Sequence, residues 1–529
     1  MNTRTNHLQL VVAVLVGLLM IGVVSLMCIQ TDASPNTHYV APGGNCGTES
    51  PCYATIQAAV DAAAEGDVVK IAAGTYDDLH DVFHGHDIYY PYTTTQVVLI
   101  SKTLTLQGGY TTADWQTPDP AGNPTTLDAK EGGRGVYATG WATVTLEGLQ
   151  IVNGRGSSSE YGEPPGGGGI AVDRSRRAWL VVRNCVLTRN GGDDGGALYI
   201  QGNSLVLEDS QIYSNTTTGT GGGLYTREVV VTMTNNLIAD NHADSMGGGA
   251  WIYESYAVLN QNTFSNNYSG WDGGGLYTGW GEIVLDGNQF LDNEADGGGG
   301  GMACGGINPG DTYTLTHNLF QGNLGARNDS TTGGGLRISA STGFLFFGYN
   351  RVLDNVASMT LGPGSGGGGG AAILGNAVIR GNLIRDNVAC SGLKCNGRGG
   401  GLLVRGHVLV DSNTILENVA TSQPCEGFQC ANGMQGGGVF IGNQSAVTLT
   451  NNVIARNAYA DQERERLDRG GSALYISAQS SPSINYAILH HNTIADNDAP
   501  AILNESAILT MSHMIFAGQS TDVKSIVDS

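Results

Sequence analysis

The sequence is short of basic residues, of proline and of charge in general. Lysine and arginine together number 25 against 47 aspartates and glutamates, which gives a formal net charge of −22. A basic stripe is the footprint of phosphate binding, so this balance argues against nucleic acid as a partner. Proline accounts for only 14 of 529 residues and glycine for 81, a composition that excludes both collagen and a proline-glycine linker.

Long hydrophobic runs are also scarce, and the one that stands out is at the N-terminus. Arg4 precedes an uncharged run over residues 8–29, and "QTDASP" follows. A positive start, an apolar stretch and small residues before a cut after Ala33 form an export signal. The run also approaches the ~20 residues that span a bilayer. We predict that residues 1–33 are an export signal or an N-terminal membrane anchor, the chain's only contact with a membrane. The remainder is then extracellular or at the cell surface.

Cysteine is rare, and its spacing fits an exported chain. In such a chain, two cysteines that lie close in sequence predict a small disulfide-closed loop. The last two of three close pairs could instead form a four-cysteine zinc site. Cys185 and Cys304 have no neighbour in sequence and are expected to be buried in strands. The three close pairs are Cys46/Cys52, Cys390/Cys395 and Cys425/Cys430.

What the sequence has in abundance is a repeat that ends in asparagine. Three positions before this closing asparagine every copy has a branched apolar residue or phenylalanine, and eight positions before it every copy has an apolar residue. Five positions before it nine of eleven copies have a second asparagine, with Cys185 and Ser210 as the exceptions. The residues between the apolar columns alternate in polarity, as strands do. The closing asparagines are Asn190, Asn215, Asn241, Asn267, Asn293, Asn323, Asn355, Asn387, Asn418, Asn457 and Asn497.

A unit of this length with strands and no helix cannot bury its apolar face alone, so the units must stack. We predict an all-β fold, a right-handed single-stranded parallel β-helix of about thirteen coils with a short N-terminal capping helix. Asparagine ladders and glycine-rich corners would close the coils. The cap and first coils are expected over 34–140 and the repeat over 141–529. The longer repeats place insertion loops along one edge, from about 324 to 470.

Several stretches resemble known families. "YATIQAAVDAAAEGDVVKIAAGTY" resembles the cap and first coil of right-handed parallel β-helix proteins of the pectate-lyase-like superfamily. "FSNN", "FLDN", "FQGN", "GGAL" and "GGGL" are similar to the paired repeats of polymorphic outer-membrane proteins, whose β-helical regions act as adhesins. The resemblance covers about residues 38–515. It implies the fold, whereas the superfamily includes lyases, hydrolases, epimerases and non-catalytic binders.

The motifs of the superfamily's enzymes are largely missing. Of the polygalacturonase set only a lone Asp-Asp, Asp193–Asp194, is present, and the D-P-H-E motif of alginate epimerases is absent. Arginines in "DRSRRAW" and "RERLDRG" could serve a lyase but have no recognisable context. A surface loop acid beside a glycine corner is the simpler interpretation of Asp193 and Asp194.

Aromatic residues recur after the glycine runs, in "LYI", "LYT", "AWI" and "LYT". If the first and third residues of each short strand point inward, the middle ones form an exposed stack on four successive coils. Such rings pack against sugar rings and suit half-wet surfaces. The alternative is that they only stack on one another, as aromatics in sheets do. The residues of this candidate glycan site are Tyr199, Tyr225, Trp251 and Tyr277.

Acidic residues often precede the closing asparagine. Asp354, Asp386 and Glu417 do so on consecutive coils, where stacked like charges repel unless a hard cation such as Ca²⁺ bridges them. The alternative is a solvated acidic edge. We predict no cofactor apart from this candidate Ca²⁺ site.

Histidine gathers with aspartate in "DDLHDVFHGHDIYYPYT". This segment holds His80, His84 and His86. Such density suits a transition metal, although no strict ligand spacing is present and a surface loop is the alternative.

Together these features predict a non-catalytic binding or adhesion scaffold, secreted or on the cell surface, with polysaccharide or a cell-surface glycan as its partner. The alternative is a polysaccharide lyase or glycoside hydrolase of the pectate-lyase-like superfamily. A purely structural surface protein is a third interpretation.

Overall fold

The computed structural model describes residues 35–84, 92–156, 166–172, 178–325, 333–358, 367–391, 397–421, 435–458, 473–477, 485–497, 500–505, 507–518 and 523–525. The predicted export segment, Cys395, Cys425, Cys430 and much of the predicted insertions lie outside these residues. Across the described ranges, no helix is both long and apolar enough to cross a membrane.

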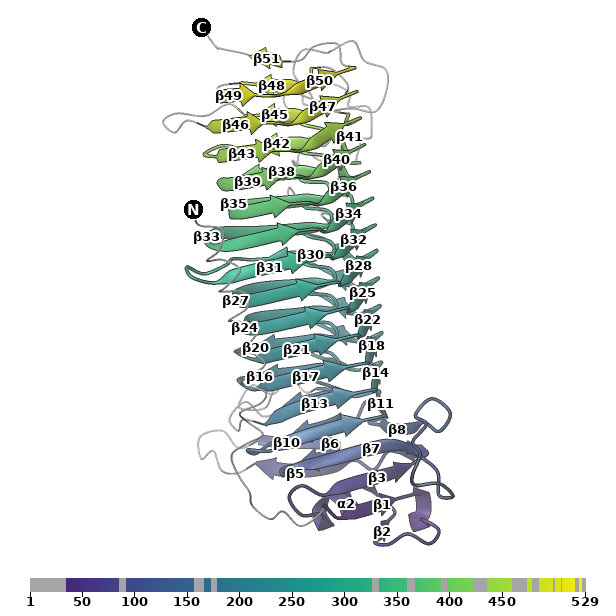
Figure 1. Ribbon diagram of the computed structural model, residues 1–529. Coiled ribbons are helices and arrows are strands. Elements are labelled where there is room, and N and C mark those ends of the chain that lie inside the picture. The colour runs from purple at the N-terminus through teal and green to yellow at the C-terminus, as the bar shows by residue number, and fades with distance from the viewer. Residues whose placement is uncertain are drawn as a thin grey trace.

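The chain winds into a column of stacked coils that rises from the purple N-terminal end to the yellow C-terminal end (Figure 1). The largest sheet runs the length of the column and its neighbouring strands are parallel, with one antiparallel exception at the N-terminal end. Its strands are β1 (Thr37–Val40), β2 (Cys52–Tyr53), β3 (Val68–Ala72), β5 (His80–His84), β6 (Tyr92–Ile100), β7 (Leu104–Tyr110), β9 (Arg134–Ala138), β10 (Thr143–Glu147), β12 (Ile170–Val172), β13 (Trp179–Arg183), β16 (Leu198–Gln201), β17 (Ser204–Glu208), β20 (Leu224–Arg227), β21 (Val230–Thr234), β24 (Ala250–Asn260), β27 (Leu276–Asp286), β30 (Met302–Cys304), β31 (Thr312–Thr316), β33 (Leu336–Gly348), β35 (Ala371–Arg380), β38 (Leu402–Arg405), β39 (His407–Asp411), β42 (Val439–Ile441), β43 (Ala446–Thr450), β45 (Leu474–Ile476), β46 (Tyr486–His490), β48 (Ile502–Asn504), β49 (Ile508–Ser512) and β51 (Val523–Ser525).

A second parallel sheet faces the first across the coil interior and has fifteen strands in the described ranges. The prediction of about thirteen coils was therefore short, because the first coils and the last one lack the asparagine pair that marks the repeat. The strands are β4 (Gly74–Tyr76), β8 (Thr125–Asp128), β11 (Leu149–Val152), β14 (Val186–Thr188), β18 (Gln211–Tyr213), β22 (Leu237–Ala239), β25 (Thr263–Ser265), β28 (Gln289–Leu291), β32 (Leu319–Gln321), β34 (Arg351–Leu353), β36 (Leu383–Arg385), β40 (Thr414–Leu416), β44 (Val453–Ala455), β47 (Thr493–Ala495) and β50 (Ile515–Ala517).

Two short parallel sheets complete the coils at the corner that follows each closing asparagine. One contains β15 (Gly191–Gly192), β19 (Thr216–Thr217), β23 (His242–Ala243), β26 (Tyr268–Ser269) and β29 (Glu294–Ala295), and the other β37 (Val388–Cys390) and β41 (Val419–Thr421).

Each coil crosses the largest sheet twice. We call the two rows of strands the first track, which contains β16, β20 and β30, and the second track, which contains β17, β21 and β31; β24, β27 and β33 run through both. The register carries each repeat position directly onto the next coil: Tyr199 pairs with Tyr225, and Tyr225 with Trp251. The prediction of a stacked parallel solenoid is therefore confirmed.

The predicted apolar columns form the core. The residues three and eight positions before each closing asparagine are all buried, and identical residues stack on themselves. The rings of Phe264, Phe290 and Phe320, for example, lie parallel with centroids 5.0 and 4.7 Å apart. Burial of such side chains contributes roughly 1.5–3 kcal/mol each.

Both asparagine columns form hydrogen-bonded ladders inside the coil. In the central coils Asn241 donates from its backbone N–H and from Nδ2 to Oδ1 of Asn267, over 3.1 and 3.0 Å. Its Nδ2 also donates to the carbonyl oxygen of Ile212, over 2.9 Å. Asn267 repeats this arrangement toward Asn293. Every polar atom of these buried amides therefore has a partner, as burial requires.

The ladder asparagines are not the residues that turn the corners. The residue before each of them has the positive φ instead, for example Asn266 at 52° and Asp292 at 51°. The asparagines predicted to close the coils therefore form the ladders, and the turn itself lies one residue earlier. The two neighbouring positions have different requirements. A short polar side chain lowers the cost of the left-handed conformation at the first position, while the side chain at the second must point inward.

The glycine runs close the remaining corner. At Gly247 φ is 69°, and a Cβ would lie 2.4 Å from the carbonyl oxygen of Ala250. At Gly248 a Cβ would lie 2.3 Å from the carbonyl oxygen of Tyr268 on the next coil. A Cβ at Gly249 would lie 2.5 Å from the carbonyl oxygen of Gly275 and 3.0 Å from Cγ of Asn267. Each glycine is thus required by a different contact.

The predicted capping helix is α2 (Ile56–Ala62), which lies across the first coils (Figure 1). Thr55 caps it by accepting a hydrogen bond from the N–H of Ala58. It buries Ile56 and Val60 toward the core. A short 3-10 helix, η1 (Pro42–Gly44), follows β1.

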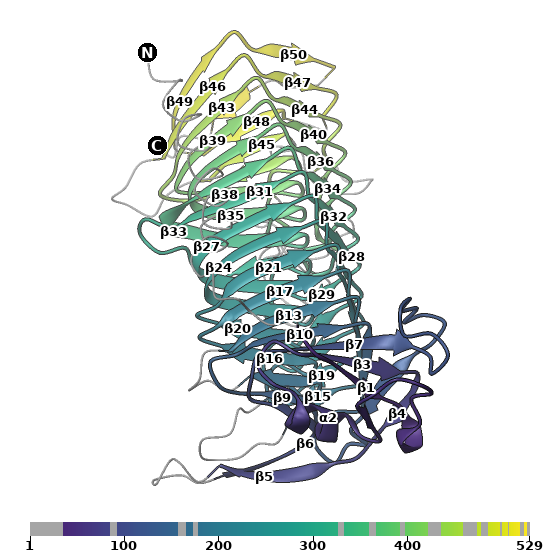
Figure 2. The same cartoon turned by 60° about the horizontal axis from the view of Figure 1, so that its bottom comes forward.

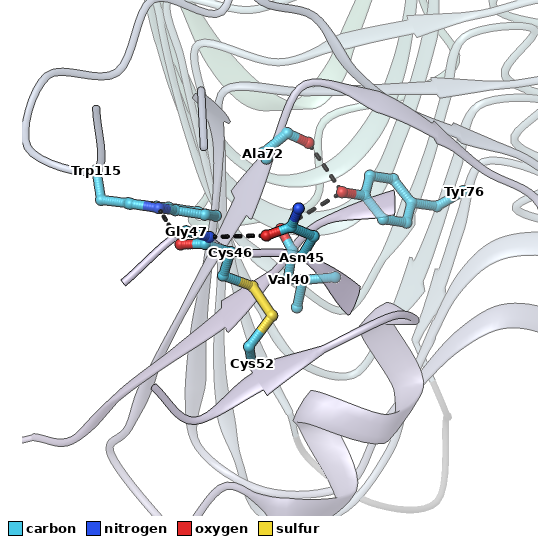
Figure 3. Close-up of a disulfide and its surroundings, with 8 residues drawn as sticks. All are labelled: Val40, Asn45, Cys46, Gly47, Cys52, Ala72, Tyr76 and Trp115. Carbon is cyan, nitrogen blue, oxygen red and sulfur yellow. Dashed lines mark hydrogen bonds between the residues drawn. A yellow bond between two sulfur atoms is a disulfide. The ribbon is translucent and has the colours of Figure 1, made fainter. Parts of the chain in front are cut away.

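The disulfide between Cys46 and Cys52 closes a small loop beside the cap (Figure 3). Trp115 covers the loop and donates from Nε1 to the carbonyl oxygen of Cys46 over 3.2 Å. Nearby, the Tyr76 hydroxyl donates to the carbonyl oxygen of Ala72 over 2.9 Å. The cap is therefore held by a covalent loop, an indole and a buried phenol.

The histidine-rich segment belongs to an antiparallel pair, β5 with β6, that projects from the N-terminal end of the column (Figure 2). His84 bonds Thr94 over 2.8 Å and stacks on Tyr92. His86 lies outside the described residues.

Candidate functional site

The predicted aromatic stack exists on the outer side of the first track. The rings of Tyr199 and Tyr225 lie 4.7 Å apart at 9°, and those of Tyr225 and Trp251 lie 4.5 Å apart at 15°. Tyr277 follows in register on the next coil. The expectation that the four residues are exposed was wrong: Tyr199 is 4%, Tyr225 8% and Tyr277 9% exposed, and Trp251 is half-buried.

Two features bury these rings. The stacked rings cover one another's faces, and the glycine corner passes beside them. A Cβ at Gly195 would lie 2.9 Å from Cβ of Tyr225, and one at Gly273 would lie 3.0 Å from Cα of Tyr277. The side chains do point away from the coil interior. Neighbouring rings and the glycine corner nevertheless shield them from solvent.

The row opens where two further aromatic residues extend it. The ring of Tyr253 stacks on Trp251 with centroids 4.9 Å apart, and Trp280 lies 5.2 Å from Tyr253. Tyr253 is half-buried and Trp280 is 42% exposed. We call Trp251, Tyr253 and Trp280 the aromatic platform. It is the part of the row that a ligand can reach.

Charged groups flank the platform. Arg227 donates from Nε to the carboxylate of Glu254 over 2.7 Å, and Glu254 follows Tyr253 in the sequence. Near Tyr277, Arg337 donates to Asp272 over 2.8 Å, with both side chains less than a third exposed. Arg337 reaches across two coils, because the small Ala303 lies between it and Tyr277 in the register.

The pKa of the Tyr277 hydroxyl is raised to about 12, mainly by burial and then by the negative charge of Asp272. The hydroxyl therefore stays protonated and neutral at any ordinary pH. Trp251 carries a buried Nε1 donor that has no hydrogen-bond partner. An unpaired buried donor is uncommon and requires an explanation.

The acidic column lies at the αL corner, where φ is 56° for Asp354, 57° for Asp386 and 56° for Glu417. Arginines share this column. Arg385 lies 2.9 Å from Asp386, and Arg456 lies 2.7 Å from Glu417. The backbone conformation and these ion pairs account for the column without a metal, and Ca²⁺ binding here stays a prediction.

Asp386 shows the effect of this packing on a carboxyl group. Burial raises its pKa most, and the charges of Glu417 and Asp354 raise it further, while Arg385 opposes them. The column is therefore an ionic edge in which like charges interact.

The cysteines divide into bonded and free. The predicted Cys46–Cys52 disulfide is confirmed. Cys390 is disulfide-bonded as well, so it cannot serve as a zinc thiolate. Cys185 and Cys304 are free and buried, as predicted. Cys185 lies at a corner rather than in a strand, where its N–H donates to Ser210 at the start of a ladder.

One group of three metal-ligating side chains occurs in the described part of the chain: His490, His491 and His513, near the C-terminal end. The pKa of His491 is lowered, mainly by desolvation from the neighbouring groups and then by the charges of His490 and His513. The sequence analysis missed this group because His513 lies 22 residues from His491 and only the coil register brings them together.

A hollow of about 300 Å³ lies beside α2, lined among others by Gln57, Asp61 and Asp78. Gln57 donates to Asp61 and also bonds the backbone of Leu99. These polar groups dock the capping helix. Of the candidate metal ligands predicted from sequence, His80 lines the hollow.

The platform extension was also missed from sequence. Tyr253 follows Trp251 at the spacing that places both on one face of a strand, which could have indicated it. Trp280 gave no such signal, because its position follows from a positive φ of 53°.

The chain matches the family described as right handed beta helix region over residues 128–290 and 195–367. No curated protein matches it. The matched segments include the coils that carry the aromatic platform and the N-terminal part of the asparagine ladders. The fold and this match together show that the chain forms a right-handed parallel β-helix of repeated coils.

Proposed function

We propose that this protein is a non-catalytic, extracellular or cell-surface scaffold that binds a glycan at the aromatic platform. The observation that carries the proposal is the exposed end of the ring row at Tyr253 and Trp280, between two ion pairs. Apolar ring faces with a few fixed polar groups at the rim are typical of sites that bind small polar molecules. Aromatic side chains also suit a surface that is partly wet.

The unpaired Nε1 of Trp251 supports the same proposal. A ligand hydroxyl or a water that entered after a small shift of Tyr253 would accept from it. The acidic overall charge favours a neutral or cation-bridged glycan over a strongly anionic polymer.

Catalysis at this position is the alternative, with the chemistry of a polysaccharide lyase or a glycoside hydrolase. Hydrolysis requires two carboxyl groups, one as acid and one as base or nucleophile. The two carboxylates that flank the platform, Glu254 and Asp272, are each bonded to an arginine. This pairing disfavours them as proton donors and supports the binding role.

The test uses the purified full chain with xylan, galactan, polygalacturonate and alginate, with and without Ca²⁺. Calorimetry measures binding, and size-exclusion chromatography measures polymer length. We expect one polymer to bind and to stay intact, and Trp280→Ala to weaken that binding at least tenfold. Trp179→Ala is the matched control, since Trp179 is 59% exposed on the second track.

Shortened polymer in the unsubstituted sample would overturn the non-catalytic role. Equal losses from Trp280→Ala and Trp179→Ala would place the binding elsewhere on the surface, against the platform.

A further inference from the structure

A cluster of three histidines lies at one corner of the last two coils. His490 ends β46, and His491 occupies the corner position that follows it. His513 occupies the equivalent corner after β49, one coil further along, because His490 pairs with Ser512 in the register. Both corner histidines have positive φ, 55° and 52°.

The three rings converge. The centroids of His490 and His491 lie 4.3 Å apart, and His513 lies 5.2 and 4.7 Å from them, edge-on. One nitrogen from each ring lies within 4.8 Å of the other two. In a tetrahedral zinc site, nitrogens 2.0–2.1 Å from the metal are about 3.3 Å apart. His491 and His513 are exposed, so small rotations close that difference.

A second contact orients one ring. Nδ1 of His490 forms a hydrogen bond with the hydroxyl of Ser512. When Nδ1 donates this bond, Nε2 keeps its lone pair free for a metal, which is how metal-ligating histidines are commonly held.

The corner conformation alone does not require histidine. Other coils have Asn235, Gln261 and Asn451 at this position, also with positive φ. A single histidine occurs there at His317, which stacks on Tyr349. Most coils thus have a small polar residue or glycine at this column, and His317 has an aromatic neighbour, so the convergence of three imidazoles at His490, His491 and His513 is unusual.

We propose that His490, His491 and His513 form a zinc site that clamps the last two coils together, with one coordination position left to water. Three neutral imidazoles are a common zinc ligand set, and their nitrogens suit zinc better than the hard cations Ca²⁺ or Mg²⁺. The proposal is independent of the glycan platform, which lies on other coils.

The experiment titrates the purified, chelator-treated full chain with Zn²⁺ by calorimetry. We expect one equivalent to bind, and His491→Asn and His513→Asn each to weaken that binding at least tenfold. Asparagine tolerates the corner conformation, so both variants should fold. His317→Asn is the matched control, because it changes the same corner on another coil and should leave the affinity unchanged. Circular dichroism verifies the fold of each variant.

A second measurement needs no variant. Mass spectrometry after histidine modification should show that Zn²⁺ protects His491 and His513 and leaves His317 reactive. No binding of Zn²⁺, unchanged affinity in the His491→Asn and His513→Asn variants, or protection of His317 alone would overturn the site. Loss of the bound equivalent in a His80→Asn/His84→Asn variant instead would also overturn it, since the metal would then belong to the β5–β6 arm.

Discussion

At the scale of single residues, the fold depends on a pair of neighbours at each corner. One residue takes the left-handed conformation, and the next sends a buried amide into the ladder. Asn266 and Asn267 are such a pair: Asn266 has a φ of 52°, and Asn267 is 1% exposed. Identical residue types thus perform different tasks one position apart.

Substitutions at Asn266 and Asn267 should therefore differ strongly in their effect on the free energy of unfolding. Asn267→Ala removes the acceptor used by the N–H and Nδ2 of Asn241 and the donor to the carbonyl oxygen of Ile238. Each stranded buried group costs about 1–3 kcal/mol, so we expect a loss of about 3 kcal/mol or more in unfolding free energy. Asn266→Gly should be nearly neutral, because glycine adopts positive φ without strain. Denaturant unfolding measures both, and similar midpoints for the two variants would contradict the division of tasks.

Asp67 predicts how stability depends on pH. Its carboxylate is 4% exposed. Burial is the largest influence and raises its pKa, but hydrogen bonds from the N–H of Ala64, from His38 and from the N–H of Asn36 together lower the pKa below its usual value. A lowered folded pKa means that the group stabilises the fold above the ordinary aspartate pKa of about 3.9. That stability is lost as pH falls through the lower, folded pKa.

The check is unfolding of the full chain between pH 7 and pH 2. We expect the cap to lose stability below about pH 4, and Asp67→Asn to be less stable at pH 7 and flatter across the acid range. The exposed Asp119→Asn variant serves as a control at neutral pH. An acid profile of Asp67→Asn as steep as that of the unsubstituted chain would refute the assignment.

At the scale of elements, corners and caps decide which sequences can form a coil. The strands tolerate many branched residues, whereas the glycine corner leaves no space between coils. Gly248 lies between the backbones of Tyr268 and Gly274.

Gly248→Ala should therefore be strongly destabilising. Its Cβ would lie 2.3 Å from one carbonyl oxygen and 2.4 Å from another, and the forced backbone shift costs about 1–3 kcal/mol. Gly306→Ala is the control, since its nearest neighbour would be 3.7 Å away. Thermal unfolding of both variants tests this, and equal melting temperatures would show that the coils can separate freely at the corner.

The cap depends on its disulfide loop. Cys46 and Cys52 are six residues apart, and closing so short a loop stabilises by about 2 kcal/mol. We expect Cys46→Ser/Cys52→Ser to loosen the cap and to shift the emission of Trp115, which bonds the carbonyl oxygen of Cys46. Faster hydrogen exchange should stay confined to the cap. Exchange that accelerated equally in the central coils would contradict a local role.

At the scale of the whole molecule, the two ends of the column differ. The N-terminal end is covered by α2. In the last coil, by contrast, Met511 and Phe516 continue the core columns of Leu489 and Ile494, and Met511 is 39% exposed and Phe516 only half-buried. Stability in a solenoid is approximately a sum of neighbour interactions, so a coil with one neighbour is weaker than a coil with two.

This asymmetry predicts a gradient of amide protection. Exchange measured by mass spectrometry should be slowest across β21, β24 and β27 and fastest across β49 and β50, because local opening follows the number of buried contacts. Uniform protection along the chain would show that the column opens as one unit. If the last coil were as strongly protected as the central coils, another segment or molecule would have to cover its open side.

The sequence predicted the fold well and the site poorly, for physical reasons. A repeat fixes which residues stack, so the core columns and both asparagine columns could be located without coordinates. The exposure of Tyr225 could not be predicted from sequence, because it depends on how closely a glycine corner passes beside the ring. Convergence of His491 with His513 depends on the last coil's length, which breaks the usual spacing. The export signal, the adhesion role and the glycan partner stay predictions.

The asparagine ladders have a direction. In each rung the backbone N–H and one Nδ2 hydrogen point toward the C-terminal end and the Oδ1 acceptor points back, as from Asn323 to Asn355 and from Asn355 to Asn387. The column is therefore a polar rod, whose amide dipoles add along its axis as those of a helix do. Two such rods would match head to tail and mismatch head to head. A duplicated coil inserted into the column must have its ladder donors and acceptors oriented as in its neighbours. The fold can therefore grow by duplication only if the new coil keeps the direction of the ladder.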